Sequence, residues 1–282
     1  MKFSFSKIKP HAEILIVLLA VACNPTEPKK ETTTQPIETV VESAVKDIPY
    51  TLVTTMPHDA NAFTEGFLFH NNQLFESTGA TSDLPQTRSL FGIVDVKTGK
   101  IDTKAELDKT IYFGEGITVL NNKLYQVTYK NQQGFIYDAK SYKKIGQFNY
   151  ANKEGWGLTT DGLSVIMSDG TENLTYFNPD GMTVVKTLVV VNNGYIEEYL
   201  NELEYINGFI YANVWLKNYI VKIDPVTGNV VGIINLENIT AKEKSVNTTA
   251  KEMNGIAYNS KDNKILVTGK MWQHIYQIDF AH

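Results

Sequence analysis

Five stretches of the sequence open with carboxylate, amide or aromatic side chains where a plain β-repeat needs only small or apolar residues. The stretches are FTEGFLFHNNQLFEST from Phe63, FGEGITVLNNKLYQVTY from Phe113, EGWGLTTDGLSVIMSDG from Glu154, LNELEYINGFIYANVW from Leu200 and MNGIAYNSKDNKILVTGK from Met253. The chemically distinctive residues at their two ends include Phe63, Glu65, Phe113, Glu115, Tyr129, Trp156, Asn201, Trp215 and Lys270. Aromatic walls with a few placed polar groups suit a small organic or peptide ligand, if the fold brings these ends together.

The five stretches share one order of features: a small or acidic opening, an apolar pair, a turn of Asn, Asp or Gly, and a second apolar run. The residues that align after the opening are Gly66, Gly116, Gly157, Leu203 and Gly255. A recurrence of about 40 to 50 residues with several strands per unit is typical of a β-propeller. We therefore predict an all-β fold with five blades, in which the repeat openings lie near the innermost strands and converge on the central channel.

Short apolar runs separated by turn residues predict hairpins throughout this region, for example at Asn71-Asn72 and Asn121-Asn122. The last repeat lacks one strand, and we expect residues 50–55 (YTLVTT) to supply it and to close the ring from the N-terminal side. Residues 195–200 (YIEEYL) indicate a short helical turn. The alternative fold is a β-sandwich or barrel with accidental similarity between its hairpins.

The charge distribution bears on the class of partner. The formal net charge of the 282 residues is −5, and no basic stripe is available to neutralise phosphates, which argues against nucleic acid. The five histidines are scattered and show no metal-ligand spacing, so we expect neither a metal nor a cofactor. We expect a monomer.

The N-terminus combines Lys2, Lys7 and Lys9 with a short apolar run, residues 14–22, that ends at the single cysteine. This pattern predicts a signal peptide over residues 1–22, too short to span a bilayer as a stable helix. The sequence AVAC resembles a relaxed lipobox, which predicts lipidation of Cys23 and an exported protein anchored in the bacterial cell envelope, facing the periplasm or the surface. The alternative is an ordinary signal peptide cleaved nearby. Residues 23–47 are rich in Thr, Pro, Glu and Lys and predict a disordered tether, with the folded domain over residues 48–282.

Across residues 50–280 the chain resembles the plant-type glutaminyl-peptide cyclotransferases, or glutaminyl cyclases, and their bacterial relatives. The stretches that carry the resemblance, in family order, are FTEG, ESTG, FGEGI, LYQVT, EGWGL, SDG, LNELEY, ANVW, IDPVTG, NGIA and VTGK. Each short match is weak alone, and the ordered set is specific. The resemblance implies a five-bladed propeller that converts the N-terminal glutamine of peptides or proteins to pyroglutamate and releases ammonia.

The resemblance also implies roles for individual residues. Glu115 matches the acid/base carboxylate of the FGEG motif. Lys270 and Asn201 match polar pocket residues that could donate hydrogen bonds to a developing oxyanion. The residues that match the substrate pocket are Phe63, Glu65, Phe113, Tyr129, Trp156 and Trp215.

The implied reaction needs this kind of set. The α-amine attacks the γ-amide carbon of its own residue, so a tight aromatic cavity that favours the compact substrate conformation lowers the barrier. One carboxylate can take the proton from the amine and give one to the leaving nitrogen. No protein nucleophile is needed, which agrees with a chain that has no Ser-His-Asp set.

Two residues depart from the family pattern. Glu65 stands where the first motif usually carries Gln, and a second carboxylate would raise the pKa of Glu115 if the two lie close, or would bind the substrate amine. Tyr129 stands where relatives often have Trp.

Other interpretations remain open. Glu115 could instead accept hydrogen bonds from strand ends, Trp156 and Trp215 could pack between blades, and Lys270 could be a surface residue. The alternative functions are a non-catalytic surface propeller that binds peptides or glycans, and a propeller hydrolase of the lactonase or quinoprotein type, for which the sequence supplies no ligand set.

Overall fold

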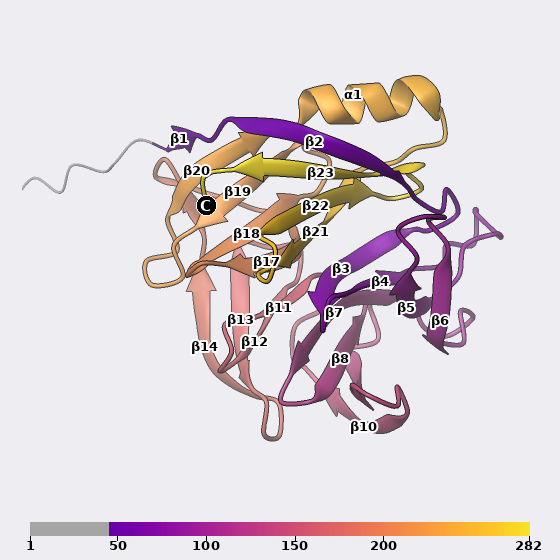
Figure 1. Ribbon diagram of the computed structural model, residues 1–282. Coiled ribbons are helices and arrows are strands. Elements are labelled where there is room, and N and C mark those ends of the chain that lie inside the picture. Colours follow the sequence, from indigo (N-terminus) through magenta and orange to yellow (C-terminus); the bar gives the residue numbers. More distant parts are fainter. Residues whose placement is uncertain (1–44) are drawn as a thin grey trace, which may run out of the picture. The chain divides into compact units, whose positions relative to one another are not determined.

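The computed structural model describes residues 45–282, which form five mainly antiparallel blades arranged around one axis and a separate two-stranded sheet (Figure 1). The predicted signal peptide, Cys23 and the predicted tether as far as residue 44 lie outside the described residues. The sheets confirm the five-bladed propeller that the repeats predict.

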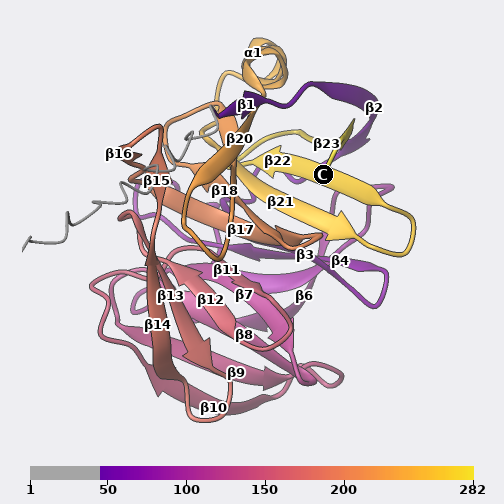
Figure 2. The ribbon, with the colours of Figure 1, turned by 90° about the vertical axis from the view of Figure 1, so that its left-hand side faces the viewer.

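Each blade runs from an innermost strand outward. The first blade contains β3 (Thr64–His70), β4 (Gln73–Thr78), β5 (Leu90–Val94) and β6 (Ile101–Glu106), and the second contains β7 (Gly114–Leu120), β8 (Lys123–Thr128), β9 (Gln133–Asp138) and β10 (Lys144–Asn149). The third contains β11 (Leu158–Thr160), β12 (Val165–Ser168), β13 (Asn173–Asn178) and β14 (Thr183–Val189). The fourth contains β17 (Leu200–Ile206), β18 (Phe209–Val214), β19 (Tyr219–Ile223) and β20 (Val230–Asn235). The fifth contains β21 (Met253–Asn259), β22 (Lys264–Gly269) and β23 (His274–Phe280). The innermost strands contact one another in order, and β21 contacts β3 (Figure 2).

The N-terminal segment of the described chain adds two strands to the ring. Strand β2 (Tyr50–Pro57) pairs antiparallel with β23 and is the outermost strand of the fifth blade. Strand β1 (Lys46–Asp47) pairs in parallel with β20 of the fourth blade. Lys46–Asp47 is therefore part of a sheet rather than the end of the predicted tether, because it completes backbone hydrogen bonding along an otherwise open edge.

The turn residues act as the sequence predicts. Asn71, Asn72, Asn121 and Asn122 all have positive φ, between 49° and 61°. Positive φ at both central residues defines the tight hairpin turns whose twist matches that of the flanking strands, and Asn tolerates this conformation. The predicted helical turn at 195–200 is wrong: Tyr195–Ile196 forms β16, which pairs with β15 (Val191–Asn192), and β17 begins at Leu200.

The hydrophobic core is divided among the blade interfaces. One cluster, for example, joins Phe67 and Leu74 of the first blade to Ala257 and Leu266 of the fifth. Four more clusters fill the other interfaces in the same way. Alternating apolar residues bury both faces of each sheet, so that burial at these interfaces holds the blades in fixed positions around the axis.

One helix interrupts the strand order. Helix α1 (Glu237–Val246) lies between β20 and β21, and its Ile239 joins the core cluster between the fourth and fifth blades. Within residues 45–282, no helix is both long and apolar enough to cross a bilayer.

The innermost strands carry bulges where they begin. The pairing register shifts between Thr64 and Gly66 in β3 and between Gly114 and Ile117 in β7, with comparable shifts at the starts of β17 and β21. A bulge twists the strand and redirects the side chains at that point. In the first two blades the shift contains Glu65 and Glu115.

The glycine that follows the opening has a packing reason. A Cβ placed on Gly116 would lie 2.5 Å from the backbone of Trp156 and Leu158 in the next blade, and one on Gly157 would lie 2.2 Å from Asn201 O. Backbones of neighbouring innermost strands approach this closely only where no side chain intervenes.

Candidate active site

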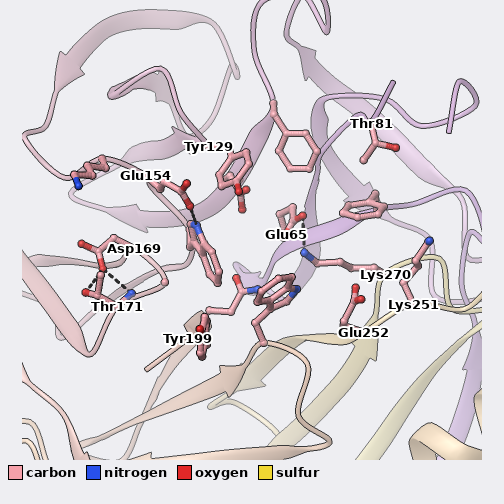
Figure 3. A pocket seen from close by; sticks show the side chains of 18 of the residues that line it. Glu65, Thr81, Tyr129, Glu154, Asp169, Thr171, Tyr199, Lys251, Glu252 and Lys270 are labelled. Carbon is pink, nitrogen blue, oxygen red and sulfur yellow. Dashed lines mark hydrogen bonds and ion pairs between the residues drawn. The ribbon is translucent and has the colours of Figure 1, made fainter. Parts of the chain in front are cut away.

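A cavity of about 630 Å³ opens at the end of the ring where the innermost strands begin. Its lining includes every site residue that the sequence predicts: Phe63, Glu65, Phe113, Glu115, Tyr129, Trp156, Asn201, Trp215 and Lys270. These residues come from all five repeats and are distributed over more than two hundred positions of the chain, so the ring alone brings them together (Figure 3).

Three ionisable side chains meet at one side of the cavity. Lys270 Nζ lies 2.8 Å from Glu65 Oε1, and the two side chains are 7% and 2% exposed. The carboxyl groups of Glu65 and Glu115 are hydrogen-bonded to one another. Glu65 thus lies between a cation and a second carboxyl group.

Burial sets the protonation of this group. Burial, followed by the negative charge of Glu65, raises the pKa of Glu115 well above its ordinary value. Burial also raises the pKa of Glu65, to about 7, although Lys270 opposes the shift. For Lys270 the carboxylates outweigh burial, and its pKa lies above the ordinary value. These directions favour a charged lysine and a Glu115 that keeps its proton and donates it to Glu65, as expected for two close carboxyls.

The bulged strand starts explain why these groups meet. Glu65 and Glu115 are each the second residue of an innermost strand, β3 and β7 respectively, within the register shift. Lys270 follows the last residue of β22, in a turn closed by the Trp272 N–H donating to Gly269 O. Strands at these positions are rigid, which fixes the distances between the charged groups.

Aromatic rings form two walls. On one side the Phe63 and Phe113 rings meet edge to face at 5.9 Å, and Tyr129 continues the row 5.8 Å from Phe113. On the other side Trp156 and Trp215 meet at 5.9 Å with planes 81° apart. The smaller ring of Tyr129 therefore keeps an aromatic wall. Neither tryptophan is buried between blades, and both line the cavity.

Asn201 lines the cavity from the start of β17. Its Oδ1 is buried and has no hydrogen-bond partner among the described residues. A buried polar atom without a partner is costly unless a ligand satisfies it. The side chain is therefore available to a bound molecule.

Other repeat-end residues have structural roles. Glu202 accepts hydrogen bonds from the backbone of the first and fifth blades, and Glu204 accepts one from Tyr258 N. Asn213 Oδ1 accepts from Gly255 N, and the Trp272 ring is fully buried. The glutamates and Asn213 therefore accept hydrogen bonds from backbone N–H groups at blade junctions, and none of these residues lines the cavity.

Several residues that line the cavity have no role predicted from the sequence. Tyr199 extends the tryptophan wall, 5.9 Å from Trp215. Glu154 accepts a hydrogen bond from Trp156 Nε1 at 2.9 Å and thereby fixes the orientation of that ring. The remaining unassigned residues are Thr81, Asp83, Leu84, Lys153, Asp169, Gly170, Thr171, Lys251 and Glu252. Most lie in connections outside the repeat openings, and the only signal for Glu154 was its place beside Trp156 in the third repeat.

Among residues 45–282, no group of three or more His, Cys, Asp or Glu side chains is arranged to hold a metal ion.

Comparisons with known proteins agree with this geometry. A family model described as glutamine cyclotransferase matches residues 15–280. The chain is 41% identical over 229 residues to a glutaminyl-peptide cyclotransferase of Arabidopsis thaliana, which covers 80% of this chain and 70% of that protein. The crystal structure of Myxococcus xanthus glutaminyl cyclase is similar with a TM-score of 0.76 and 30% identity, over 84% of this chain and 98% of that one.

Proposed function

The chain belongs to the glutamine cyclotransferase family, and from that premise we propose that it is a glutaminyl-peptide cyclotransferase in which Glu115 shuttles the proton. The reaction closes the N-terminal glutamine of a peptide into pyroglutamate. The observation that carries the role of Glu115 is its position: it is a buried carboxyl in the cavity, hydrogen-bonded to Glu65, and burial raises its pKa well above the ordinary value.

The bonds and protons balance with a single acid/base group. The lone pair of the neutral α-amine forms a bond to the γ-amide carbon, and the bond from that carbon to the amide nitrogen breaks. Glu115 gives its proton to the leaving nitrogen, which departs as ammonia, and takes one from the nitrogen that has entered the ring. Glu115 therefore ends the cycle protonated, as it began.

Glu65 acts on Glu115 rather than on the substrate bonds. When Glu65 is ionised and paired with Lys270, it orients the acidic proton of Glu115, and its charge raises the pKa of that group. A carboxyl group whose pKa is at or above the working pH keeps its proton between turnovers and can donate it in the next one.

Lys270 and Asn201 stabilise the negative charge that develops on the amide oxygen. Lys270 is a buried cation, and Asn201 lines the cavity with an amide whose Nδ2 can donate, whereas its partnerless Oδ1 can only accept, for example from the substrate amine. Preorganised donors of this kind act most strongly where water is excluded. The aromatic walls exclude water and hold the glutamine side chain folded back toward its own amine.

The direct test is a coupled assay of ammonia release. We expect release from a peptide that begins with Gln, and none from the same peptide with an acetylated amine, since the nucleophile is then blocked. We expect loss of release in Glu115→Gln. A protein that binds Gln-initiated peptides saturably but releases no ammonia would support the alternative, a non-catalytic peptide-binding propeller.

We further propose that the enzyme acts as a monomer, anchored in the bacterial cell envelope through lipid on Cys23. The apolar run that ends at Cys23 and the polar stretch after it support export and anchoring. Mass spectrometry of the mature N-terminus tests lipidation, and Cys23→Ala should move the protein from the membrane fraction to the soluble one. Light scattering tests the monomer.

A further inference from the structure

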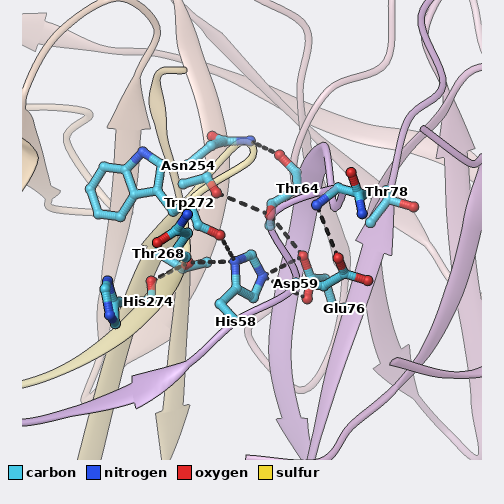
Figure 4. Close-up of polar contacts among 12 residues, drawn as sticks. His58, Asp59, Thr64, Glu76, Thr78, Asn254, Thr268, Trp272 and His274 are labelled. Atoms are coloured by element: carbon cyan, nitrogen blue, oxygen red, sulfur yellow. Dashed lines mark hydrogen bonds and ion pairs between the residues drawn. The ribbon is translucent and has the colours of Figure 1, made fainter. Parts of the chain in front are cut away.

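A second buried ionic group lies behind the cavity and does not line it. His58, in the segment between β2 and β3, has both ring nitrogens engaged: Nδ1 lies 2.8 Å from Trp272 O, and Nε2 lies 3.0 Å from each carboxyl oxygen of Glu76 (Figure 4). Neither side chain of the His58–Glu76 pair has any exposed area.

The acceptors fix the charge on His58. A carbonyl oxygen only accepts, so Nδ1 carries a proton, and a carboxylate only accepts, so Nε2 carries one as well. The charged groups that face the ring are Glu76 and, more remotely, Asp59. Although burial favours the neutral ring, these acidic groups hold the pKa of His58 above its ordinary value. The pair is therefore an imidazolium and a carboxylate.

The pair joins the two segments that carry the charged groups of the active site. On one side, Thr64 Oγ1 donates to Glu76 Oε1 at 2.7 Å, and Thr64 directly precedes Glu65. On the other side, His58 Nδ1 donates to the carbonyl oxygen of Trp272. The N–H of the same Trp272 donates to Gly269 O and closes the turn that contains Lys270.

Backbone contacts run parallel to this link. Met271 N donates to Ala62 O at 2.7 Å, and His58 N donates to Gln273 O at 2.8 Å. Met271 has a φ of 59°, a conformation that a side chain of this size rarely adopts. Such a backbone persists where the surroundings enforce it, and it occurs often at functional sites.

From this geometry we propose that the His58–Glu76 pair is a positioning device, which holds the Lys270 turn against the strand of Glu65 and so maintains the Lys270–Glu65 ion pair. His58 touches neither the cavity nor the substrate, and it acts through Lys270. The inference rests on the proposed function, in which Lys270 and Glu65 set the electrostatics of the site.

The protein contains a second His–Glu pair that serves as a control, although its histidine is 34% exposed. His274 Nδ1 lies 2.9 Å from Glu243 Oε2, and this second His–Glu pair joins β23 to helix α1 on the outside of the same blade. Neither His274 nor Glu243 lines the cavity. The same substitution in the two pairs separates a general loss of stability from a specific effect on the active site.

The main variant is His58→Gln, whose amide can still donate to Glu76 but no longer reaches the Trp272 carbonyl. We expect kcat for ammonia release to fall about 10- to 100-fold with little change in KM, since a displaced charged group can reduce turnover to this extent. We expect His274→Gln to change kcat less than about twofold, because it leaves the active-site geometry intact.

The pH profile supplies a readout that a purely structural role would not move. Lys270 lowers the pKa values of both Glu65 and Glu115, against the raising effects of burial and of the nearby carboxylates Glu154 and Glu252. Loosening Lys270 removes this effect, so the pH profile of kcat in His58→Gln should move to higher pH. The profile of His274→Gln should coincide with that of the wild type.

A double-mutant cycle with Lys270→Met completes the test. If His58 acts through Lys270, His58→Gln should reduce kcat much less in the Lys270→Met background than in the wild type. If His58→Gln does not fold, Glu76→Gln, which keeps the side-chain volume and removes the charge, takes its place in every measurement.

The outcomes are distinct. A variant with a lowered melting temperature, an unchanged kcat and an unchanged pH profile overturns the inference and leaves the proposed function standing. Equal losses of kcat from His58→Gln and His274→Gln also overturn it. Full turnover in Lys270→Met overturns the role of Lys270 in the proposed function, and the inference with it.

Discussion

Glu115 and Glu202 occupy the same position in their blades, each as the last residue of the repeat opening, yet their surroundings are opposite. Glu115 lines the cavity and faces the carboxyl group of Glu65. Glu202 is equally buried, but one carboxyl oxygen accepts from Phe67 N at 3.1 Å and the other from Ile256 N at 2.8 Å. One glutamate faces ionisable side chains, and the other joins the backbones of two further blades.

Burial alone does not distinguish the two. It is the largest cause of the raised pKa of both Glu115 and Glu202. The charge of Glu204 also raises the pKa of Glu202, but the hydrogen-bond partners differ. The backbone N–H groups that bond to Glu202 cannot change their protonation, whereas Glu65 and a bound substrate can. A buried glutamate in this ring is therefore a candidate acid or base only where its partners can exchange protons.

The largest effect should come from the cavity side of this comparison. Glu115→Gln removes the acid and base of the reaction, and we expect kcat to fall by a factor of about 10² to 10⁴. The free energy of unfolding should not decrease, because an amide avoids the cost of burying a carboxyl beside Glu65. Steady-state ammonia release and urea unfolding measure the two quantities. Turnover within tenfold of the wild type would refute the shuttle.

The junction side should respond in the reverse manner. Glu202→Gln places an amide NH₂ against one of two backbone donors, which leaves a buried N–H without an acceptor. We expect a loss of about 1–3 kcal/mol in the free energy of unfolding, with kcat little changed. Urea denaturation followed by fluorescence gives the first value. If this variant instead lost turnover and kept its stability, the assignment of a structural role to Glu202 and a catalytic role to Glu115 would be wrong.

Glu65→Gln tests how the cavity pair is tuned. The substitution removes a negative charge that raises the pKa of Glu115. The pKa of Glu115 should therefore fall, and the loss of activity at high pH should begin at a lower pH. Near pH 6 we expect kcat to change less than about tenfold, since the amide still hydrogen-bonds to Glu115. Measuring kcat of the variant between pH 5 and 9 tests this expectation. A shift of the activity loss toward higher pH would contradict the effect of the Glu65 charge on the pKa of Glu115.

The smallest effect concerns stability as a function of pH. Burial raises the pKa of Glu65 from 4.5 to about 7. Between these values the folded protein binds more protons than the unfolded chain, so the free energy of unfolding falls as pH rises through the window. Glu65→Gln should make this decline shallower, by at most about 1.4 kcal/mol per pH unit. Urea denaturation at several pH values measures the slope, and an unchanged slope would show that Glu65 ionises alike in both states.

The repeat pattern predicted the fold because turn chemistry and strand alternation are local. Pairs such as Asn71 and Asn72 favour one turn wherever they occur, and the aligned glycines mark close approaches between innermost strands. Helix α1 was not predicted. It has few apolar residues, and its buried Glu243 finds its partners, His274 and Tyr276, only in a strand that follows it in the sequence.

The residues of the site were predicted because resemblance to a family supplied roles that spacing does not. The same repeat position holds Glu65, Glu115, Trp156, Glu202 and Asn254, and only the first three line the cavity. Bulges do not decide which blade turns this position toward the cavity, since Glu202 and Asn254 also lie in register shifts. The neighbouring blades decide it, and no local pattern records them. The His58–Glu76 pair was not predicted for a related reason, since its members are ordinary polar residues until the ring joins them.

The contact between His58 and Trp272 spans 214 positions of the chain. During synthesis His58 emerges early, and its partner emerges only when the fifth blade is nearly complete. Closing so long a loop is slow, and the contact forms late if folding follows the order of synthesis. A nascent or truncated chain with four finished blades would therefore contain Glu115, Trp156 and Trp215 but lack Lys270, so its active site would be incomplete. Activity in this protein reports that the whole chain has folded.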